Sequence, residues 1–162
     1  FRVIGFVRHG FSDDYVKNSL SGVEGFIEVL PRYVDGLRGL EGFSHIIVLA
    51  FMHRTSDRDR EVLLVRPRGL GRRLGIAFNE LPEVGVFASD SPHRPNPIAL
   101  TIVKLLKIEG GLLHVAGLDL FNGTPVLDIK PYTPSRCIED LSLPKWYREL
   151  LSKAREKGLK EI

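Results

Sequence analysis

The sequence is poor in the residues that chemical damage attacks first. Its 162 residues include one cysteine, one methionine, four asparagines and no glutamine. Because proteins from hot environments carry fewer thermolabile residues, we expect a thermophilic source. A single cysteine, Cys137, excludes an internal disulfide, and the chain opens with no basic-then-apolar leader. Both observations favour a reducing cytoplasm as the location.

Long apolar runs are also absent. The longest, residues 46–52, is too short to cross a bilayer, so we expect no membrane partner. The net charge is only +3, but residues 54–73 hold seven arginines against three acidic residues. One interpretation is a solvated face of alternating charges; the other is a positive patch that contacts a nucleic-acid backbone, favoured because the arginines at 66–73 have no acidic neighbour.

Short apolar runs separated by glycine and proline fill most of the chain. With 43% hydrophobic residues, the chain can close one core but not two large ones. Residues 109–111 predict a tight turn within a hairpin, and Asn122-Gly123 is the strongest turn signal in the chain. The pattern predicts strands at residues 1–7, 26–29, 43–52, 61–65, 84–88, 98–108, 112–118 and 125–130.

The only convincing helix in the sequence is C-terminal. Ser142 can cap it, Pro144 suits its first turn and Gly158 can end it. Many short strands with one helix indicate a barrel or a sandwich. We predict an all-β protein, a small antiparallel β-barrel with an appended C-terminal helix. The barrel domain is expected at residues 1–138 and the helical extension at residues 139–162.

Residues 69–75, with three glycines and two arginines, are superficially similar to a nucleotide-binding loop. The third glycine comes one residue late for a Rossmann fingerprint, and Leu81-Pro82 leaves little room for the helix that should follow. We interpret this segment as a flexible loop. His45 and His53 share one face of a predicted strand, but no cysteine or further histidine completes a metal-ligand spacing, so we expect no metal.

The proline-rich segment at residues 91–97 is the most unusual part of the chain. Its three prolines exclude a helix and hold the preceding residues extended, so the loop is stiff before any ligand arrives. Arg94 can then present a planar guanidinium to a phosphate or carboxylate, and Asn96 an amide. A rigid crossover with a solvated arginine is an equally weighted alternative.

A carboxylate, an amine and a phenol follow the Asn-Gly turn. Period-two alternation puts Leu127 and Ile129 on one face of the strand, and Asp128, Lys130 and Tyr132 on the other. Such a cluster can shift proton affinities, because Asp128 favours the protonated form of Lys130. Without further context, a surface ion pair of little energetic weight is the simpler interpretation.

Several of these motifs together closely resemble one family, the TsaA-like domain, whose characterised members methylate threonylcarbamoyladenosine in tRNA. The resemblance covers residues 3 to about 134 and is most specific at residues 91–100 (SPHRPNPIAL) and 118–132 (LDLFNGTPVLDIKPY). It implies a small antiparallel β-barrel that works as a homodimer and uses S-adenosylmethionine without a Rossmann domain. The implied substrate is the tRNA anticodon stem-loop.

The resemblance also implies roles for individual residues. Asp128, Lys130 and Tyr132 match its DIKPY signature and are expected at the reacting centre, and Arg94 matches its RPNP arginine and is expected to bind the threonyl carboxylate. The implied cofactor contacts are His53, Arg54, Leu100, Asp119, Leu120, Phe121 and Asn122.

The sequence departs from the family pattern at two cofactor contacts. Asp90 stands where family members commonly place arginine, and a Pro-Arg-Gln contact near the N-terminus is not found around residues 16–18. Two alternatives to the tRNA methyltransferase therefore remain. One is a non-catalytic RNA-binding barrel, and the other is a methyltransferase of the same fold that acts on another RNA or on a small molecule.

Overall fold

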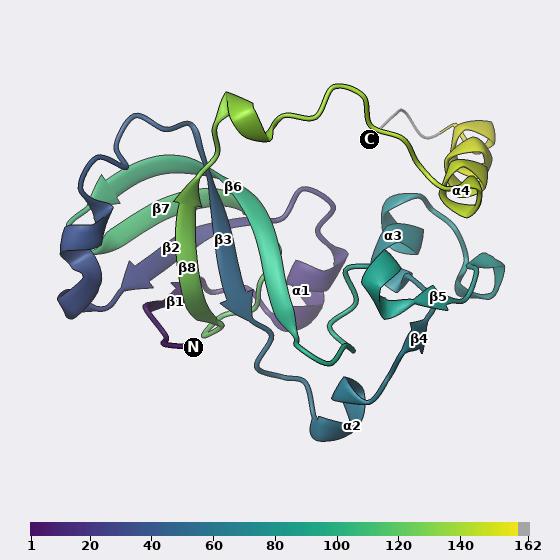
Figure 1. Ribbon diagram of the computed structural model, residues 1–162, viewed down its shortest axis with the longest axis horizontal. Coiled ribbons are helices and arrows are strands. Elements are labelled where there is room, and N and C mark those ends of the chain that lie inside the picture. Colours follow the sequence, from purple (N-terminus) through teal and green to yellow (C-terminus); the bar gives the residue numbers. More distant parts are fainter. Residues whose placement is uncertain (159–162) are drawn as a thin grey trace. The chain divides into compact units, whose positions relative to one another are not determined.

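The computed structural model describes residues 1–158 (Figure 1). Two compact units make up the chain: Phe1–Arg54 with Pro97–Arg136, and Thr55–Asn96 with the segment that begins at Cys137. Each unit is considered by itself below, and the expected domain boundary at residue 138 stays a prediction. Among the described residues, no helix is long and apolar enough to cross a membrane.

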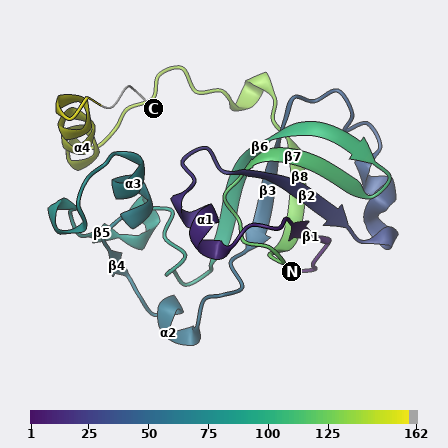
Figure 2. The same ribbon diagram turned by 180° about the vertical axis from the view of Figure 1, so that it is seen from behind.

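The first unit is a closed barrel of six antiparallel strands in the order β1-β2-β7-β6-β3-β8 (Figures 1 and 2). This confirms the predicted all-β barrel. Side chains fill the interior of the barrel. On β3, the alternate residues Ile46, Val48 and Ala50 are wholly buried there. The strands are β1 (Gly5–Arg8), β2 (Val23–Val29), β3 (His45–Phe51), β6 (Ile98–Glu109), β7 (Leu112–Leu118) and β8 (Pro125–Pro131).

Both turn predictions are confirmed. β6 and β7 form a hairpin in which Glu109 pairs with Leu112 across two glycines. At the second turn Gly123 has φ +78°, and the Thr124 N–H donates to the Phe121 carbonyl at 3.1 Å. β7 and β8 are not neighbours, however. β8 instead lies between β3 and β1 and closes the barrel.

A bulge corrects the expected alternation on β8. The register against β3 shifts between Leu49 and Ala50, so Leu127 is an extra residue. Val126 is wholly buried and Ile129 packs against the same core, whereas Leu127 does not belong to it. The prediction that Leu127 and Ile129 share one face was therefore wrong, because a bulge reverses the alternation on one side of itself.

The second unit has a small core of its own. Leu74, Ile76 and Leu81 pack with Leu150 and Ala154 of the C-terminal helix. Its elements are β4 (Leu64–Val65), β5 (Val84–Gly85), the helices α2 (Asp57–Arg60), α3 (Arg68–Arg73) and α4 (Lys145–Glu156), and the 3₁₀ turns η2 (Phe78–Glu80) and η3 (Val86–Ala88). β4 and β5 pair antiparallel as a two-stranded ribbon.

The segment interpreted as a flexible glycine loop is instead mostly helix α3. Gly71 is buried in it, and a Cβ at this position would lie 2.8 Å from the Cδ1 of Leu81. Glycine at residue 71 thus permits close packing on a hydrophobic neighbour. The absence of a Rossmann loop is unaffected.

The expectation that only the C-terminus is helical was also wrong. The barrel unit contains α1 (Asp13–Asn18) and the 3₁₀ turns η1 (Pro31–Leu37) and η4 (Pro134–Arg136), and the other unit contains α2 and α3. The C-terminal helix itself is confirmed, but Pro144 and not Ser142 occupies its N-cap position, and no side chain caps it there. Gly158 follows it with φ +81°, as expected for a residue that ends a helix.

Candidate functional site

Two segments with implied cofactor contacts meet beside the barrel. His53 and Arg54 follow the end of β3, and residues 119–122 connect β7 to β8. The guanidinium carbon of Arg54 lies 5.4 Å from the centre of the Phe121 ring. A cation at this distance from an aromatic face is attracted by the ring's quadrupole. The fold therefore brings together residues that are far apart in the sequence.

Helix α1 adds two charged residues that the sequence analysis missed. Asp13 forms an ion pair with Arg54, and the Lys17 ammonium lies 5.4 Å from the centre of the Phe121 ring. Phe121 thus contacts two cations, and each of them is paired with a carboxylate of α1, Arg54 with Asp13 and Lys17 with Asp14. A signal for this helix was present, since Ser12 is followed by two acidic residues in the manner of an N-cap.

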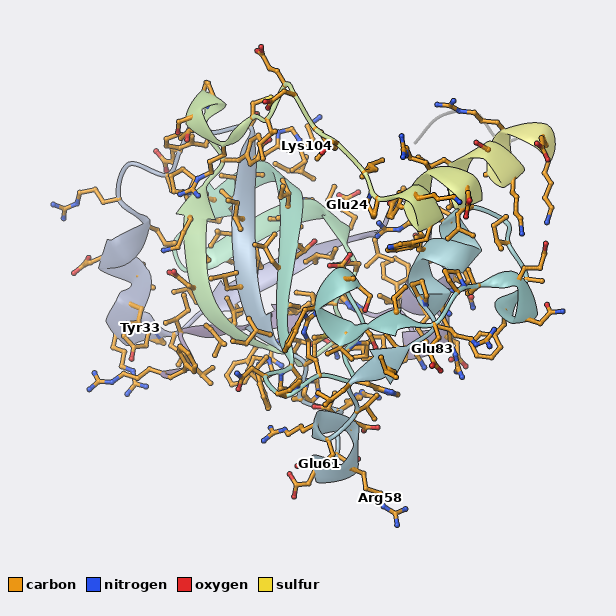
Figure 3. The ribbon with its side chains drawn as sticks, turned by 45° about the vertical axis from the view of Figure 1, so that its right-hand side comes forward. Glu24, Tyr33, Arg58, Glu61, Glu83 and Lys104 are labelled. Atoms are coloured by element: carbon orange, nitrogen blue, oxygen red, sulfur yellow. The ribbon has the colours of Figure 1, made fainter. Side chains whose placement is uncertain are left out.

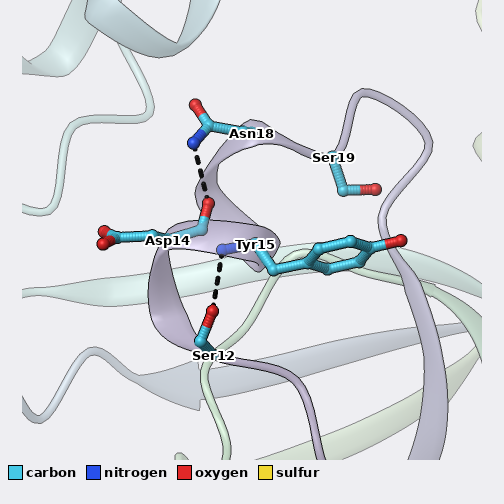
Figure 4. Close-up of a pocket in the computed structure, with 5 residues that line it drawn as sticks. All are labelled: Ser12, Asp14, Tyr15, Asn18 and Ser19. Atoms are coloured by element: carbon cyan, nitrogen blue, oxygen red, sulfur yellow. Dashed lines mark hydrogen bonds between the residues drawn. The ribbon is translucent and has the colours of Figure 1, made fainter.

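Figure 4 shows a pocket at α1. The Tyr15 N–H donates to the Ser12 side chain at 3.3 Å, and the Asn18 amide donates to the Asp14 carbonyl at 2.8 Å. These bonds hold both ends of a helix of only six residues. The pocket is lined by Ser12, Asp14, Tyr15, Asn18 and Ser19.

His9 holds the connection between β7 and β8 in place. Its Nε2 lies 2.9 Å from the Leu120 carbonyl, and its backbone N–H donates to Asn122 Oδ1 at 3.1 Å. Leu120 is only 6% exposed, so its side chain belongs to the core. Asp119, in contrast, is exposed.

The pKa of His53 is lowered from its ordinary value. Burial is the largest cause and the positive charge of Arg54 the second, while the negative charge of Asp13 opposes both. Because the folded state binds this proton less tightly than the unfolded chain, its contribution to stability is present above about pH 6.5 and is lost as the pH falls below that value. The imidazole is therefore held neutral at neutral pH.

Two substitutions should move this pKa in opposite directions. Arg54→Met removes a repelling cation and is expected to raise the pKa of His53, yet leave it below 6.5, because burial remains. Asp13→Asn removes an attracting anion and is expected to lower it further. Titration of the His53 ring protons by NMR measures both. Shifts in the same direction would show that the charges do not act on this ring as described.

The predicted acid and amine are paired on β8. The Lys130 ammonium lies 2.6 Å from Asp128 Oδ2, and the two side chains are 46% and 43% exposed. Asp128 Oδ1 also accepts the N–H of Ile129 at 2.9 Å, which fixes the carboxylate. Tyr132 continues the strand pairing, since its N–H donates to the His45 carbonyl at 3.1 Å.

Leu100 lies in the same cross-strand row as Asp128. Leu49 on β3 is opposite Leu100 on one side and opposite Asp128 on the other. Leu100 is 63% exposed, so its side chain is on the outer face of the barrel. The row thus combines an exposed apolar side chain with the half-exposed carboxylate of Asp128.

Arg94 belongs to the second unit. Its guanidinium donates to the Ser89 carbonyl at 3.0 Å, and the His93 N–H donates to the Ser91 side chain at 3.2 Å. These contacts tie the proline-rich segment to the residues just before it, and its stiffness stays a prediction. The expected role of Arg94 beside Asp128 stays a prediction.

The arginine-rich segment divides into two parts. On α2 the charges alternate in sign, because Asp59 lies between Arg58 and Arg60 and Glu61 follows the helix. Arg58 and Glu61 extend from this part of the chain (Figure 3), and Asp59 lies 3.6 Å from His93. Around α3 the pattern differs. Within residues 1–158, no carboxylate forms an ion pair with Arg66, Arg68, Arg72 or Arg73.

Comparison with known proteins points in one direction. Residues 17–136 match the tRNA-methyltransferase O N-terminal domain family. A crystal structure of TrmO superposes with a TM-score of 0.65 at 34% identity, covering 87% of this chain and 61% of that one. These matches confirm the resemblance found in the motifs.

Two curated relatives differ in the share of their own length that aligns with this chain. A probable S-adenosyl-L-methionine-binding protein of Pyrococcus abyssi is 33% identical over 98% of this chain and 83% of its own length. The human tRNA (adenine(37)-N6)-methyltransferase is 40% identical over 65% of this chain but only 23% of its own length. The shared part is thus most of this chain and a minor part of the human enzyme.

Proposed function

This chain belongs to the tRNA-methyltransferase O family, and on that premise we propose that it transfers a methyl group from S-adenosylmethionine to tRNA. The target we propose is the exocyclic amino nitrogen of threonylcarbamoyladenosine next to the anticodon. The observation that carries the proposal is the meeting of Arg54 with Phe121, since two segments with implied cofactor contacts converge there.

The side chains present suit such a cofactor. S-adenosylmethionine carries a carboxylate, an ammonium, an adenine ring and a sulfonium, and when bound it supplies an electrophilic methyl group. Arg54 suits the carboxylate, the exposed Asp119 suits the ammonium, and Phe121 and Leu100 offer apolar surface to the adenine and the carbon chain. The neutral ring of His53 adds no positive charge that would repel the sulfonium.

The chain must also remove a proton from the target nitrogen. That nitrogen belongs to a urea joined to a purine, so its lone pair is delocalised and it is a poor nucleophile until deprotonated. The Lys130 ammonium lies 2.6 Å from Asp128 Oδ2, and we assign Asp128 as the general base that takes the proton of the target nitrogen and Lys130 as the group that orients its carboxylate. Tyr132 is assigned to stacking on the base or to donating to the urea oxygen.

Binding of the RNA is assigned to arginines. Arg94 retains guanidinium donors beyond the one bonded to Ser89, and a bidentate pair with the threonyl carboxylate would use two of them. The arginines around α3 are assigned to the phosphates of the anticodon stem-loop, because no carboxylate among the described residues forms an ion pair with them.

Arg72→Ala tests the phosphate assignment. Each arginine on a phosphate releases counterions when RNA binds, so losing one is expected to flatten the plot of log affinity against log salt by about one unit. The measurement is fluorescence anisotropy of an anticodon stem-loop RNA at several salt concentrations. Arg38→Ala is the control, because Arg38 is an exposed arginine after η1 and is expected to leave the slope unchanged. An unchanged slope for Arg72→Ala would place that side chain off the RNA.

Two experiments separate this function from its alternatives. Calorimetric titration with S-adenosylmethionine should show binding, whereas a non-catalytic RNA-binding barrel would show no heat. Mass spectrometry of nucleosides from tRNA incubated with protein and cofactor should show methylated threonylcarbamoyladenosine. A methyl group on another nucleoside would instead support a methyltransferase with a different RNA target, and binding of the cofactor with no methylated nucleoside would support one that acts on a small molecule.

We also propose a homodimer and, given the tRNA substrate, a cytoplasmic location. Leu100 and Ile102 on the outer face of β6 are 63% and 46% exposed, and they lie opposite Leu49 and Ile47 of β3. An apolar strip of this kind on a barrel wall is suited to a second copy of the chain.

A further inference from the structure

Phe78 is half exposed although it lies next to a hydrophobic core. It is the first residue of η2 and is 50% exposed, whereas Leu74, Ile76 and Leu81 around it are almost wholly buried. A large aromatic ring that stays in solvent loses the free energy that burial would provide. The side chains that contact this ring therefore indicate which ligand it can bind.

Two arginines lie against the Phe78 ring. The guanidinium carbon of Arg68 is 4.6 Å from the ring centre and that of Arg66 is 5.8 Å. Arg66 is also anchored, since its guanidinium donates to the Leu81 carbonyl at 2.9 Å and to the Asn79 carbonyl at 3.4 Å. The Arg68 N–H donates to the Arg66 carbonyl at 2.8 Å, which ties the two arginines together through the backbone.

The positive charge here is not neutralised. Glu80, the acidic residue nearest to Phe78 in sequence, accepts the Ala77 N–H and lies 3.8 Å from Lys153 and 3.5 Å from Lys157. Within the described chain, neither Arg66 nor Arg68 has a carboxylate partner. An exposed aromatic ring with two uncompensated guanidinium groups results.

We propose that Phe78, Arg66 and Arg68 form a stacking platform for an unpaired base of single-stranded RNA. The inference rests on the proposed tRNA substrate and names a contact outside its reacting centre. Aromatic rings and guanidinium planes both stack on nucleobases, and the remaining guanidinium donors suit the adjoining phosphates. An acidic peptide would bind the two guanidinium groups through its carboxylates and would make no contact that requires the Phe78 ring.

Phe78→Leu tests the platform, because leucine keeps an apolar side chain and removes the ring. The probe is a fluorescein-labelled anticodon stem-loop RNA, compared by anisotropy with a fully paired RNA duplex of equal phosphate number. Affinity for the stem-loop is expected to fall by about tenfold, and affinity for the duplex to stay the same. Arg68→Lys, which keeps the charge but not the plane, should weaken stem-loop binding with an unchanged salt slope.

The matched control is Phe87→Leu. Phe87 is 79% exposed in the same unit, and no guanidinium lies over its ring among the described residues. Its replacement should leave stem-loop affinity unchanged, and circular dichroism should show that all three variants are folded. An equal loss for the Phe87 variant would show that any exposed apolar side chain suffices.

Other outcomes would also overturn the platform. Normal stem-loop binding by Phe78→Leu, or an equal loss on the duplex, removes base stacking. Competition by polyglutamate that requires Phe78 would point to an acidic peptide instead. The proposed function fails separately: if the wild-type chain binds the stem-loop through Phe78 but methylates no tRNA, the platform stands and the methyltransferase does not.

Discussion

Asp128→Asn is expected to lower kcat for methyl transfer by about a hundred- to ten-thousand-fold while leaving the affinity for S-adenosylmethionine unchanged. An amide of the same shape can still accept the Ile129 N–H, but it cannot take a proton from the target nitrogen. Single-turnover transfer to tRNA measures the rate, and calorimetry measures cofactor affinity.

Glu28→Gln is the matched control for that result. Glu28 is also a half-exposed carboxylate on a barrel strand, and it lies 2.6 Å from Arg8 in an ion pair. Its neutralisation should leave kcat unchanged. Lys130→Met distinguishes the two members of the Asp128–Lys130 ion pair as candidate bases: if lysine is the base, this variant loses as much activity as Asp128→Asn. Full turnover by Asp128→Asn would remove Asp128 from the mechanism.

Gly22→Ala is expected to lower the free energy of unfolding of the barrel by about 3–5 kcal/mol. Gly22 has φ +72°, in the left-handed region that disfavours a side chain. A Cβ there would also lie 2.5 Å from the carbonyl carbon of Gly117 and 2.8 Å from the Leu118 oxygen. Backbone strain and a clash with backbone therefore add.

Gly39→Ala separates the two contributions. Gly39 has a similar φ of +84°, but nothing lies within 4 Å of the position where its Cβ would be. Only strain remains, so the loss should be about 1–2 kcal/mol. Urea unfolding followed by circular dichroism measures both variants. Equal losses would mean that the close approach to β7 does not exist in solution.

Features set by neighbouring residues could be predicted best. The hairpin across Gly110-Gly111 and the turn at Asn122-Gly123 follow from backbone preferences of glycine and asparagine that need no distant partner. Helix α1 could have been predicted in the same way from Ser12 and the two acids after it. Apolar periodicity does not reveal this helix, because six residues are too few to show a repeat of 3.6 residues.

Features set by distant residues could not be predicted. The bulge at Leu127 depends on how β8 is paired with β3, so a two-residue alternation read along one strand could not reveal it. Gly71 was interpreted as part of a flexible loop. The side chain that leaves no room for a Cβ at this position belongs to Leu81, ten positions away, so the neighbouring residues gave no sign of it.

For this protein, sequence alone determined the class of fold and the family, because strand patterning, turns and the DIKPY signature are local. Only the tertiary structure decided which residues meet. Asp13 reaches Arg54 and Arg68 reaches Phe78 because strand pairing and core packing place remote segments together, and the energy of such contacts depends on distances that no local pattern encodes.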